Sequence, residues 1–169
     1  MKILMVCLGN ICRSPLAEGI MYNKIKKNNL NWQVESVGTG NSTIGQSAHY
    51  LSEKVARLHG VDISRHRARQ FKKEDMIDFD KIYVMDIDNY NDVKKMSCEL
   101  WNATKIDLLM NEKYPGENIN IPDPWYSEEP AFYTVYKMID EACESIIEKY
   151  VTAEQSIVLS EQQQAFKVS

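Results

Sequence analysis

The opening stretch of this chain constrains its fold more than any other. The segment Ile3–Val6 is an unbroken apolar run without polar alternation, which is typical of a short strand buried on both faces. Further on, Ser14 offers an N-cap hydroxyl, and Pro15 suits the first helical position, where no N–H is needed. The sequence therefore predicts a strand, a tight loop and a helix, with Cys7 at the strand end and Arg13 at the helix entrance.

The loop between Cys7 and Arg13 is only five residues long, so it must curl. Backbone N–H groups of such a loop can turn inward beside a helix N-terminus and form an anion-binding nest. Gly9 is expected to permit close backbone approach, and Asn10 tolerates a left-handed conformation. Arg13 can place two N–H donors on a phosphate-like anion, and its field favours the thiolate of Cys7 over the thiol. A nucleophile at the floor of an oxyanion cradle predicts phosphoryl transfer.

A purely structural interpretation of the same residues is the alternative. A lone cysteine at the end of a buried strand is usually a small core residue, and an isolated arginine is usually a surface charge. The strand before the loop and the Ser-Pro helix start after it favour the functional interpretation.

This loop resembles that of a known family. The sequence from Cys7 to Glu18, CLGNICRSPLAE, is similar to the phosphate-binding loop of the low-molecular-weight protein tyrosine phosphatases. The pair Asp123-Pro124 matches the general acid that the family carries late in the chain. The likeness runs from about Lys2 to Tyr150 and leaves out the tail. The resemblance implies a four-stranded α/β architecture.

The composition is that of one globular domain. The chain has 169 residues with 44% hydrophobic content, and it has no apolar stretch long enough to span a membrane. A formal net charge of −4 argues against nucleic acid and against an acidic membrane surface as partners. Four cysteines without close paired spacing fit neither a zinc site nor a disulfide framework, so we expect no metal, no cofactor and a reduced, cytoplasmic setting. We assign residues 1–150 to a phosphatase domain and 151–169 to a polar, mobile tail, and we expect a monomer.

Predicted strands and helices alternate along the chain. Strands are expected at 3–6, 33–37, 82–85 and 106–109, and helices after Ser14 and at 48–59, 72–78, 88–96 and 132–150. This alternation predicts an α/β fold: a single three-layer domain with a four-stranded parallel sheet and helices on both faces. Ligands bind outside the carboxyl ends of such strands, where Cys7 is expected to lie.

The resemblance assigns catalytic roles to Cys7 as nucleophile, Arg13 as oxyanion ligand, Asp123 as general acid, and Ser14. Asp123 stands between two prolines, which present its carboxyl from a rigid loop. A bound phosphate dianion favours the protonated acid by like-charge repulsion. Ser14 is expected to cap the helix, and in the family the matching hydroxyl also hydrogen-bonds the nucleophilic sulfur.

The substrate-binding candidates are Leu8, Gly9, Asn10, Ile11, Cys12, Trp125 and Tyr126. Trp125 and Tyr126 follow the acid where the family commonly carries two aromatics, and a flat wall suits a phenyl ring. Family members that act on phosphoarginine tend to carry Thr at the position of Ile11, so the resemblance favours phosphotyrosine. For Cys12, a small buried filler and a redox role stay equally open, and by resemblance it could form a disulfide that shields Cys7.

Two places depart from the family pattern. The facing loop has Ser42 where many members carry an aromatic, and a usual Pro-Asp pair is replaced by Ala48-His49. One wall of the pocket, and with it the substrate preference, is therefore not fixed by the resemblance. His66 is similar to a family position that supports the loop asparagine.

The sequence thus predicts a metal-independent phosphatase that hydrolyses phosphotyrosine-containing proteins through a phosphocysteine intermediate. Arsenate reductase shares this fold and loop, but it needs two further, closely spaced cysteines; only Cys98 lies between Cys12 and Cys143, and both Cys98 and Cys143 are expected in the core. A phosphoarginine phosphatase on the same fold is another alternative. A non-catalytic phosphoprotein-binding module is the third, and loss of Cys7 or Asp123 would indicate it.

Overall fold

The computed structural model describes residues 1–167, with side chains described as far as Thr152. Four parallel strands form one sheet in the order β2-β1-β3-β4. The strands are β1 (Lys2–Cys7), β2 (Gln33–Gly38), β3 (Lys81–Val84) and β4 (Ile106–Leu108). The four predicted strands are confirmed, and their ends differ from the predicted ones by no more than one residue.

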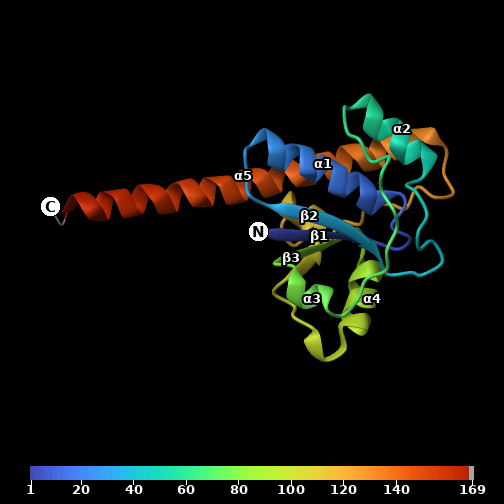
Figure 1. The fold of residues 1–169 in the computed structure, drawn as a ribbon, viewed down its shortest axis with the longest axis horizontal. Coiled ribbons are helices and arrows are strands. Elements are labelled where there is room, and N and C mark those ends of the chain that lie inside the picture. Colours follow the sequence, from blue (N-terminus) through green and yellow to red (C-terminus); the bar gives the residue numbers. More distant parts are fainter. Residues whose placement is uncertain (168–169) are drawn as a thin grey trace.

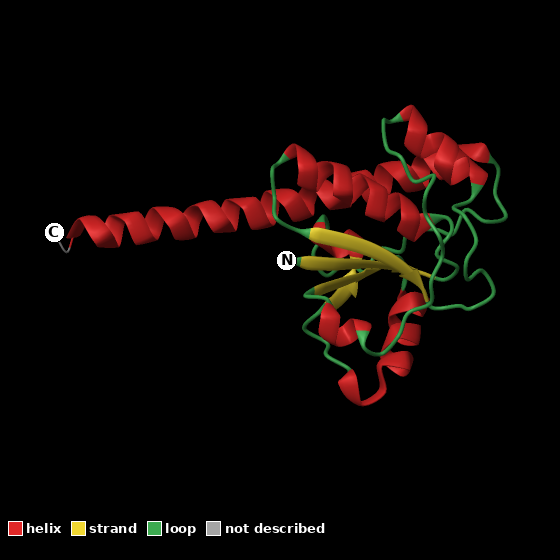
Figure 2. Cartoon of the chain, in the orientation of Figure 1, coloured by secondary structure: helices red, strands yellow, loops and turns green. Residues whose placement is uncertain are grey.

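Helices cover both faces of the sheet, as predicted. They are α1 (Arg13–Lys27), α2 (Tyr50–Leu58), α3 (Asp75–Asp78), α4 (Ile87–Ser97) and α5 (Glu129–Lys167), with short 3-10 helices η1 (Cys98–Leu100) and η2 (Leu109–Glu112). Figure 1 shows α1, α2 and α5 on one side of the sheet, and α3 and α4 on the other. Figure 2 shows that the loops at one end of the strands gather on the side away from the C-terminus.

The side chains of β1 explain why the apolar run carries no polar alternation. Ile3, Met5 and Cys7 lie in the core that the sheet shares with α1, α2 and α5. Leu4 and Val6 lie in the second core, which includes residues of α3 and α4. Because side chains alternate across a strand, a central strand between two helical layers must be apolar at every position.

The strand order places a ligand site at the carboxyl end of β1. The chain crosses from β1 to β2 on one side and later returns to β3 on the other side of β1. In open parallel sheets, ligands bind where the direction of the crossovers reverses. Cys7 ends β1, and Asp86 follows β3 and caps α4 by accepting the N–H of Asn89.

Helix α1 begins differently from the prediction. Cys12 occupies its N-cap position without a side-chain cap, and α1 starts at Arg13. The predicted N-cap role of Ser14 is wrong, because Ser14 already lies inside the helix and its hydroxyl contacts Cys7, Asn10 and Val37.

The last helix is longer than predicted. Helix α5 was expected to end at Tyr150 and instead continues to Lys167, where it projects away from the sheet (Figure 1). The segment 151–167 has no glycine or proline to stop it and is rich in good helix formers. The division of the chain at residue 150 and the mobility of 151–169 stay predictions.

The prediction that Cys98 and Cys143 lie in the core is confirmed for one of them and wrong for the other. Cys143 is buried on α5, as predicted. Cys98 was predicted to lie in the core, but it is exposed. The chain leaves α4 at Cys98 with a positive φ of 49°, so this residue ends the helix instead of continuing its buried face.

Candidate active site

A hollow of about 340 Å³ opens at the carboxyl end of β1. It brings together most of the residues predicted from the sequence: Cys7, Leu8, Gly9, Ile11, Cys12, Arg13, Asp123, Trp125 and Tyr126. Ser42 and Thr43, from the facing loop, complete its lining. Of the predicted site residues, only Asn10 and Ser14 lie behind the lining, and both contact the sulfur at its floor.

Two polar groups surround the thiol of Cys7, which is 2% exposed. The backbone N–H of Asn10 donates to Sγ over 3.2 Å, and the hydroxyl of Ser14 lies 3.0 Å from it. The Ser14 hydroxyl accepts from Nδ2 of Asn10 at 2.9 Å, and its single proton can be donated either to Sγ or to the carbonyl oxygen of Val37, 3.3 Å away. Both groups can therefore donate to a negatively charged sulfur.

Asn10 fixes the shape of the loop. Its φ of 52° confirms the predicted left-handed conformation. Its side chain donates to the hydroxyls of Ser14 and Ser36, both at 2.9 Å, and accepts from the backbone N–H of Arg69 at 2.9 Å. Its carbonyl oxygen accepts from Nε2 of His66 at 2.6 Å, as the resemblance implied. Every polar group of this fully buried residue thus has a partner, which holds the Cys7–Arg13 loop in one conformation.

The glycine that the loop requires is not the predicted one. A Cβ at Gly9 would meet Ile11 and Thr43 at ordinary contact distances of 3.4 and 3.5 Å. A Cβ at Gly38, at the end of β2, would lie 2.6 Å from the carbonyl oxygen of Leu8 and 3.0 Å from the nitrogen of Asn10. The loop backbone therefore passes so close to β2 that only glycine fits at position 38.

Arg13 is held between two carboxylates. Its Nη1 donates to Oδ2 of Asp86 at 2.5 Å and to the carbonyl oxygen of Ile121 at 3.0 Å, and its Nη2 donates to Oδ2 of Asp123 at 2.8 Å. Burial alone lowers the pKa of Arg13, but the negative charges of Cys7 and Asp123 and the bond to Asp86 outweigh it and raise that pKa. The guanidinium is therefore a permanent cation on the wall of the hollow.

Asp123 is oriented by its own loop. Its Oδ1 accepts the backbone N–H of Trp125 at 3.1 Å, while its Oδ2 is bound by Arg13. The side chain is half-exposed at the rim of the hollow. This carboxyl is therefore available to a group bound between it and the sulfur.

Some side chains of the hollow's walls are exposed, and one, Trp125, packs against a neighbouring ring. Leu8 is 51% exposed and Tyr126 is 97% exposed, so both stand at the rim. Trp125 packs edge-on against the ring of His49, with ring centroids 5.4 Å apart, and His49 stacks on Phe132 at 5.1 Å. Ser42 lines the opposite side, where the resemblance implied a missing aromatic.

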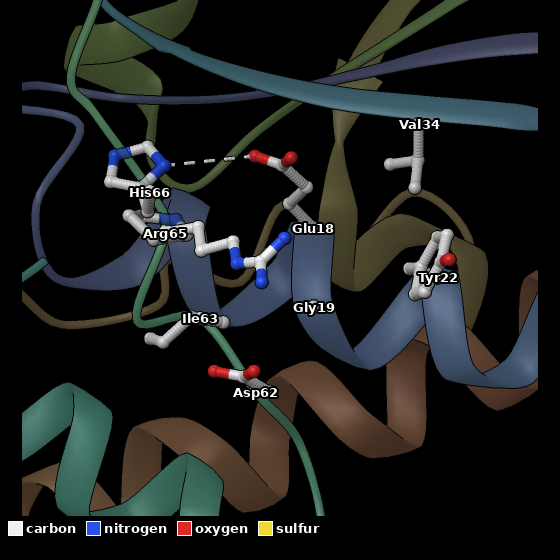
Figure 3. Close-up of a pocket in the computed structure, with 9 residues that line it drawn as sticks. Glu18, Gly19, Tyr22, Val34, Asp62, Ile63, Arg65 and His66 are labelled. Carbon is white, nitrogen blue, oxygen red and sulfur yellow. Dashed lines mark ion pairs between the residues drawn. The ribbon is translucent and has the colours of Figure 1, made fainter.

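A second layer lies behind the loop, along α1. Ser36, which accepts from Asn10, donates to Oε2 of Glu18. Figure 3 shows Glu18 and His66 facing each other on the wall of a separate cavity of about 280 Å³, with Nδ1 and Oε2 3.9 Å apart. Burial raises the pKa of Glu18 and lowers that of His66, so both neutral forms are favoured.

Cys12 is buried in the loop and is a free thiol, like Cys7. Burial, and to a lesser degree the charges of Cys7 and Asp123, raise the pKa of Cys12 to about 12. Its thiol is therefore protonated at neutral pH. This geometry is compatible with a filler role and with a redox role, and both stay predictions.

Sequence reasoning missed three contributors: Asp86, Thr43 and the supporting role of His49. The available signal for Asp86 was its position just after a predicted strand at the edge where Cys7 lies. Thr43 donates to the carbonyl oxygen of Gly9 at 2.6 Å, which ties the facing loop to the Cys7–Arg13 loop. Among the residues whose side chains are described, no group of three or more His, Cys, Asp or Glu is placed to hold a metal ion.

The sequence and the fold both match known proteins. The family model described as low molecular weight phosphotyrosine protein phosphatase matches residues 2–157. The human protein of that name is 37% identical over 151 residues, which cover 88% of this chain and 94% of the human protein. A low molecular weight protein-tyrosine-phosphatase of Bacillus subtilis, YfkJ, is 32% identical, with 86% of this chain and 93% of that protein covered.

Solved structures agree with these matches. A protein tyrosine phosphatase from Entamoeba histolytica superimposes with a TM-score of 0.83 at 33% identity, covering 91% of this chain and 99% of that chain. A Drosophila arginine phosphatase superimposes with a TM-score of 0.82 at 32% identity, covering 89% and 98%. This chain belongs to the low molecular weight phosphotyrosine protein phosphatase family.

Proposed function

We propose that this enzyme hydrolyses phosphotyrosine in proteins through a phosphocysteine intermediate on Cys7. The observation that supports this most strongly is the shared hollow, in which Sγ of Cys7, the guanidinium of Arg13 and the carboxyl of Asp123 line one space. A nucleophile, an oxyanion ligand and a proton donor are the three groups that a metal-independent phosphomonoester hydrolysis needs.

In the first step, the thiolate of Cys7 attacks phosphorus, and a P–S bond forms as the bond to the tyrosyl oxygen breaks. Asp123 gives its proton to the leaving phenolate, so the peptide leaves as neutral tyrosine. Arg13 and the loop amides hold the equatorial phosphoryl oxygens, whose charge they stabilise through the transition state.

In the second step, water attacks phosphorus and the P–S bond breaks. The ionised Asp123 accepts the proton of that water, inorganic phosphate leaves, and the sulfur returns to the thiolate. The hydroxyl of Ser14, 3.0 Å from Sγ, stabilises the thiolate as the leaving group.

We assign phosphate binding to the loop residues Leu8 to Cys12, and binding of the substrate ring to Leu8, Ile11, Trp125 and Tyr126. The uncharged rim formed by Leu8, Trp125 and Tyr126 supports an aryl ester as substrate. Ile11 supports the same choice, because it offers an apolar wall and no hydroxyl to a guanidinium-type phosphate. The similar Drosophila structure is an arginine phosphatase, so phosphoarginine is the competing substrate that the test below includes.

Partners and location are part of the proposal. We expect phosphotyrosine proteins as substrates, a monomeric enzyme, a cytoplasmic location, and no nucleic acid or membrane partner. In the described part of the chain, no helix is both long and apolar enough to cross a membrane. An arsenate reductase would need a resolving pair of cysteines, whereas Cys98 is exposed outside the hollow and Cys143 is buried in α5.

The test measures the rates at which the enzyme hydrolyses phosphotyrosine, phosphoserine and phosphoarginine peptides and p-nitrophenyl phosphate. All assays contain a metal chelator and are repeated with vanadate as inhibitor. We expect vanadate-sensitive hydrolysis of the two aryl phosphates in preference to the others. Cys7→Ser is the control, which should abolish turnover and retain phosphate binding. Preferred hydrolysis of phosphoarginine, or undiminished turnover by Cys7→Ser, would overturn the proposal.

A further inference from the structure

A second hollow adjoins the active site across Leu8. Its volume is about 390 Å³, and it is lined by residues that include Leu8, Thr39, Gln70, Asp92, Lys95 and Met96. Leu8 lines both hollows and is 51% exposed, so it forms their common rim. We call this second space the side hollow.

Three of the polar residues that line the side hollow, Thr39, Gln70 and Asp92, are hydrogen-bonded to one another, whereas Lys95 is not part of this network. The hydroxyl of Thr39 donates to Oδ2 of Asp92 at 2.9 Å, and Nε2 of Gln70 donates to the carbonyl oxygen of Thr39 at 3.0 Å. Asp92 is half-buried and already hydrogen-bonded. The ammonium of Lys95 is exposed and pairs with no residue whose side chain is described.

The charge around the rim is asymmetric. Lys95, in the last turn of α4, lines the side hollow with Asp92, whose carboxylate already accepts the hydroxyl of Thr39. The opposite rim of the active site carries the uncharged rings of Trp125 and Tyr126. A peptide that places its phosphotyrosine against Cys7 must leave the active site over this rim, and its next residues then meet either a cation or an aromatic surface.

We propose that the side hollow is a subsite for the residue that flanks phosphotyrosine in the substrate, and that it selects an acidic side chain. The carboxylate of this substrate residue pairs with the ammonium of Lys95, and the methylene groups of the same residue pack on Leu8 and Met96. This inference rests on the proposed phosphotyrosine activity and specifies which phosphopeptides the same site takes. The two hollows share Leu8, and successive residues of an extended chain are about 3.3 to 3.6 Å apart, so we place the residue next to phosphotyrosine in the side hollow.

The test measures kcat/KM for paired phosphotyrosine peptides that differ only in Glu against Gln at the flanking positions. We expect the wild-type enzyme to prefer the Glu peptides and the ratio to fall as salt is raised, because the pair is exposed. Lys95→Glu should lower the Glu-to-Gln ratio by about three- to tenfold, as expected when an exposed attraction becomes a repulsion. Lys95→Gln should give an intermediate ratio.

Lys94→Glu is the matched control. It carries the same charge change on the same turn, but Lys94 lies over the ring of Trp101 and does not line the side hollow. We expect its ratio to stay close to that of the wild type. The subsite is overturned if Lys95→Glu leaves the Glu-to-Gln ratio of kcat/KM unchanged, or if both variants lower that ratio equally.

Failure of the subsite and failure of the proposed function are distinguishable. Hydrolysis of free phosphotyrosine by the wild-type enzyme tests the function alone, because this substrate has no flanking residue. If that hydrolysis is absent, the same Glu-to-Gln comparison can be made as peptide binding to Cys7→Ser, where equal affinities overturn the subsite.

Discussion

Nη2 of Arg13 lies 2.8 Å from Oδ2 of Asp123, so the proposed oxyanion ligand and the proposed acid are paired with each other. Nη2 carries a second N–H, and Nε is buried with no hydrogen-bond partner among the described residues, so both can bind phosphoryl oxygens while Asp123 stays in place. The anion ligand and the proposed proton donor can therefore act on the same bound phosphate.

The first prediction concerns Asp123→Ala. Loss of the proton donor should lower kcat on p-nitrophenyl phosphate by roughly a hundredfold to ten-thousandfold. Because a negative charge beside Arg13 is also removed, inorganic phosphate should bind more tightly than to the wild type. Steady-state kinetics with phosphate as a competitive inhibitor measures both effects. Near-normal turnover would remove Asp123 from the mechanism, and weaker phosphate binding would mean that its charge does not oppose the bound anion.

The second prediction concerns the other carboxylate on Arg13. Asp86→Asn keeps an oxygen to cap α4, but it removes the charge that Nη1 contacts. The buried guanidinium of Arg13 then has one negative charge fewer beside it. We expect this to lower the free energy of unfolding by roughly 1 to 3 kcal/mol and to weaken phosphate binding. Urea denaturation and phosphate inhibition test this. The control is Asp88→Asn, an exposed carboxylate on the first turn of the same helix, which should change neither quantity appreciably.

The third prediction separates catalysis from loop support. Ser14→Ala removes the hydroxyl beside the sulfur, and a hydrogen bond to a charged group of this kind predicts a loss in kcat of about 10- to 100-fold. Ser36→Ala is the comparison, because Ser36 holds the Asn10 side chain without touching Sγ. A loss in kcat of the same size in both variants would mean that Ser14 acts only on the loop.

The fourth prediction concerns thiol reactivity. Burial, followed by the charges of Cys7 and Asp123, raises the pKa of Cys12 to about 12, so iodoacetamide at pH 7.5 should leave it unmodified. Cys7 should react, and phosphate should protect it, whereas exposed Cys98 should react with or without phosphate. Peptide mapping by mass spectrometry follows each site. Labelling of Cys12 as fast as Cys98 would contradict the assignment.

The fold was predictable because its signals are local. The apolar run of β1 indicates a strand with a helical layer on each face, and alternating strands and helices predict the parallel sheet. The position of Cys7 beside Arg13 was predictable for the same reason, since a five-residue loop joins them. The Asp-Pro pair was found through the resemblance, because nothing local links Asp123 to Arg13.

What the sequence did not reveal depends on chain segments that meet only after folding. Asp86 reaches Arg13 because strand order puts β3 beside β1, and no local pattern encodes that order. The requirement for glycine fell on Gly38 instead of Gly9, because the close approach is between β2 and the loop. Ser14 carries a typical N-cap side chain, yet contacts with Cys7 and Asn10 outweigh the local preference.

The last prediction concerns His49, where this chain departs from the family pattern. Its backbone N–H donates to the carbonyl oxygen of Ile11 at 2.7 Å, which ties it to the Cys7–Arg13 loop. Its Nδ1 accepts the N–H of Leu51 at 3.3 Å and so caps α2, and its ring packs against Phe132 and Trp125. Only the neutral imidazole can accept at Nδ1.

Burial lowers the pKa of His49 below its ordinary value of 6.5. The folded protein therefore takes up this proton less readily than the unfolded chain. The stabilising contribution of neutral His49 is complete above pH 6.5, and it is lost as the pH falls from 6.5 towards the lower pKa of the folded state, because the unfolded chain is protonated first.

His49→Asn keeps a capping oxygen but has no group that titrates in this range. We expect the wild type to lose stability relative to His49→Asn as the pH falls from 7.5 to 5.5, in parallel urea denaturation series. His66, whose pKa is also lowered by burial, is present in both proteins and cancels in the difference. Because Trp125 loses its neighbour, His49→Asn should also raise KM for aryl phosphates more than it lowers kcat. Parallel pH curves for the two proteins would mean that the proton on His49 has no influence on the fold, and an unchanged KM would mean that Trp125 does not depend on that ring.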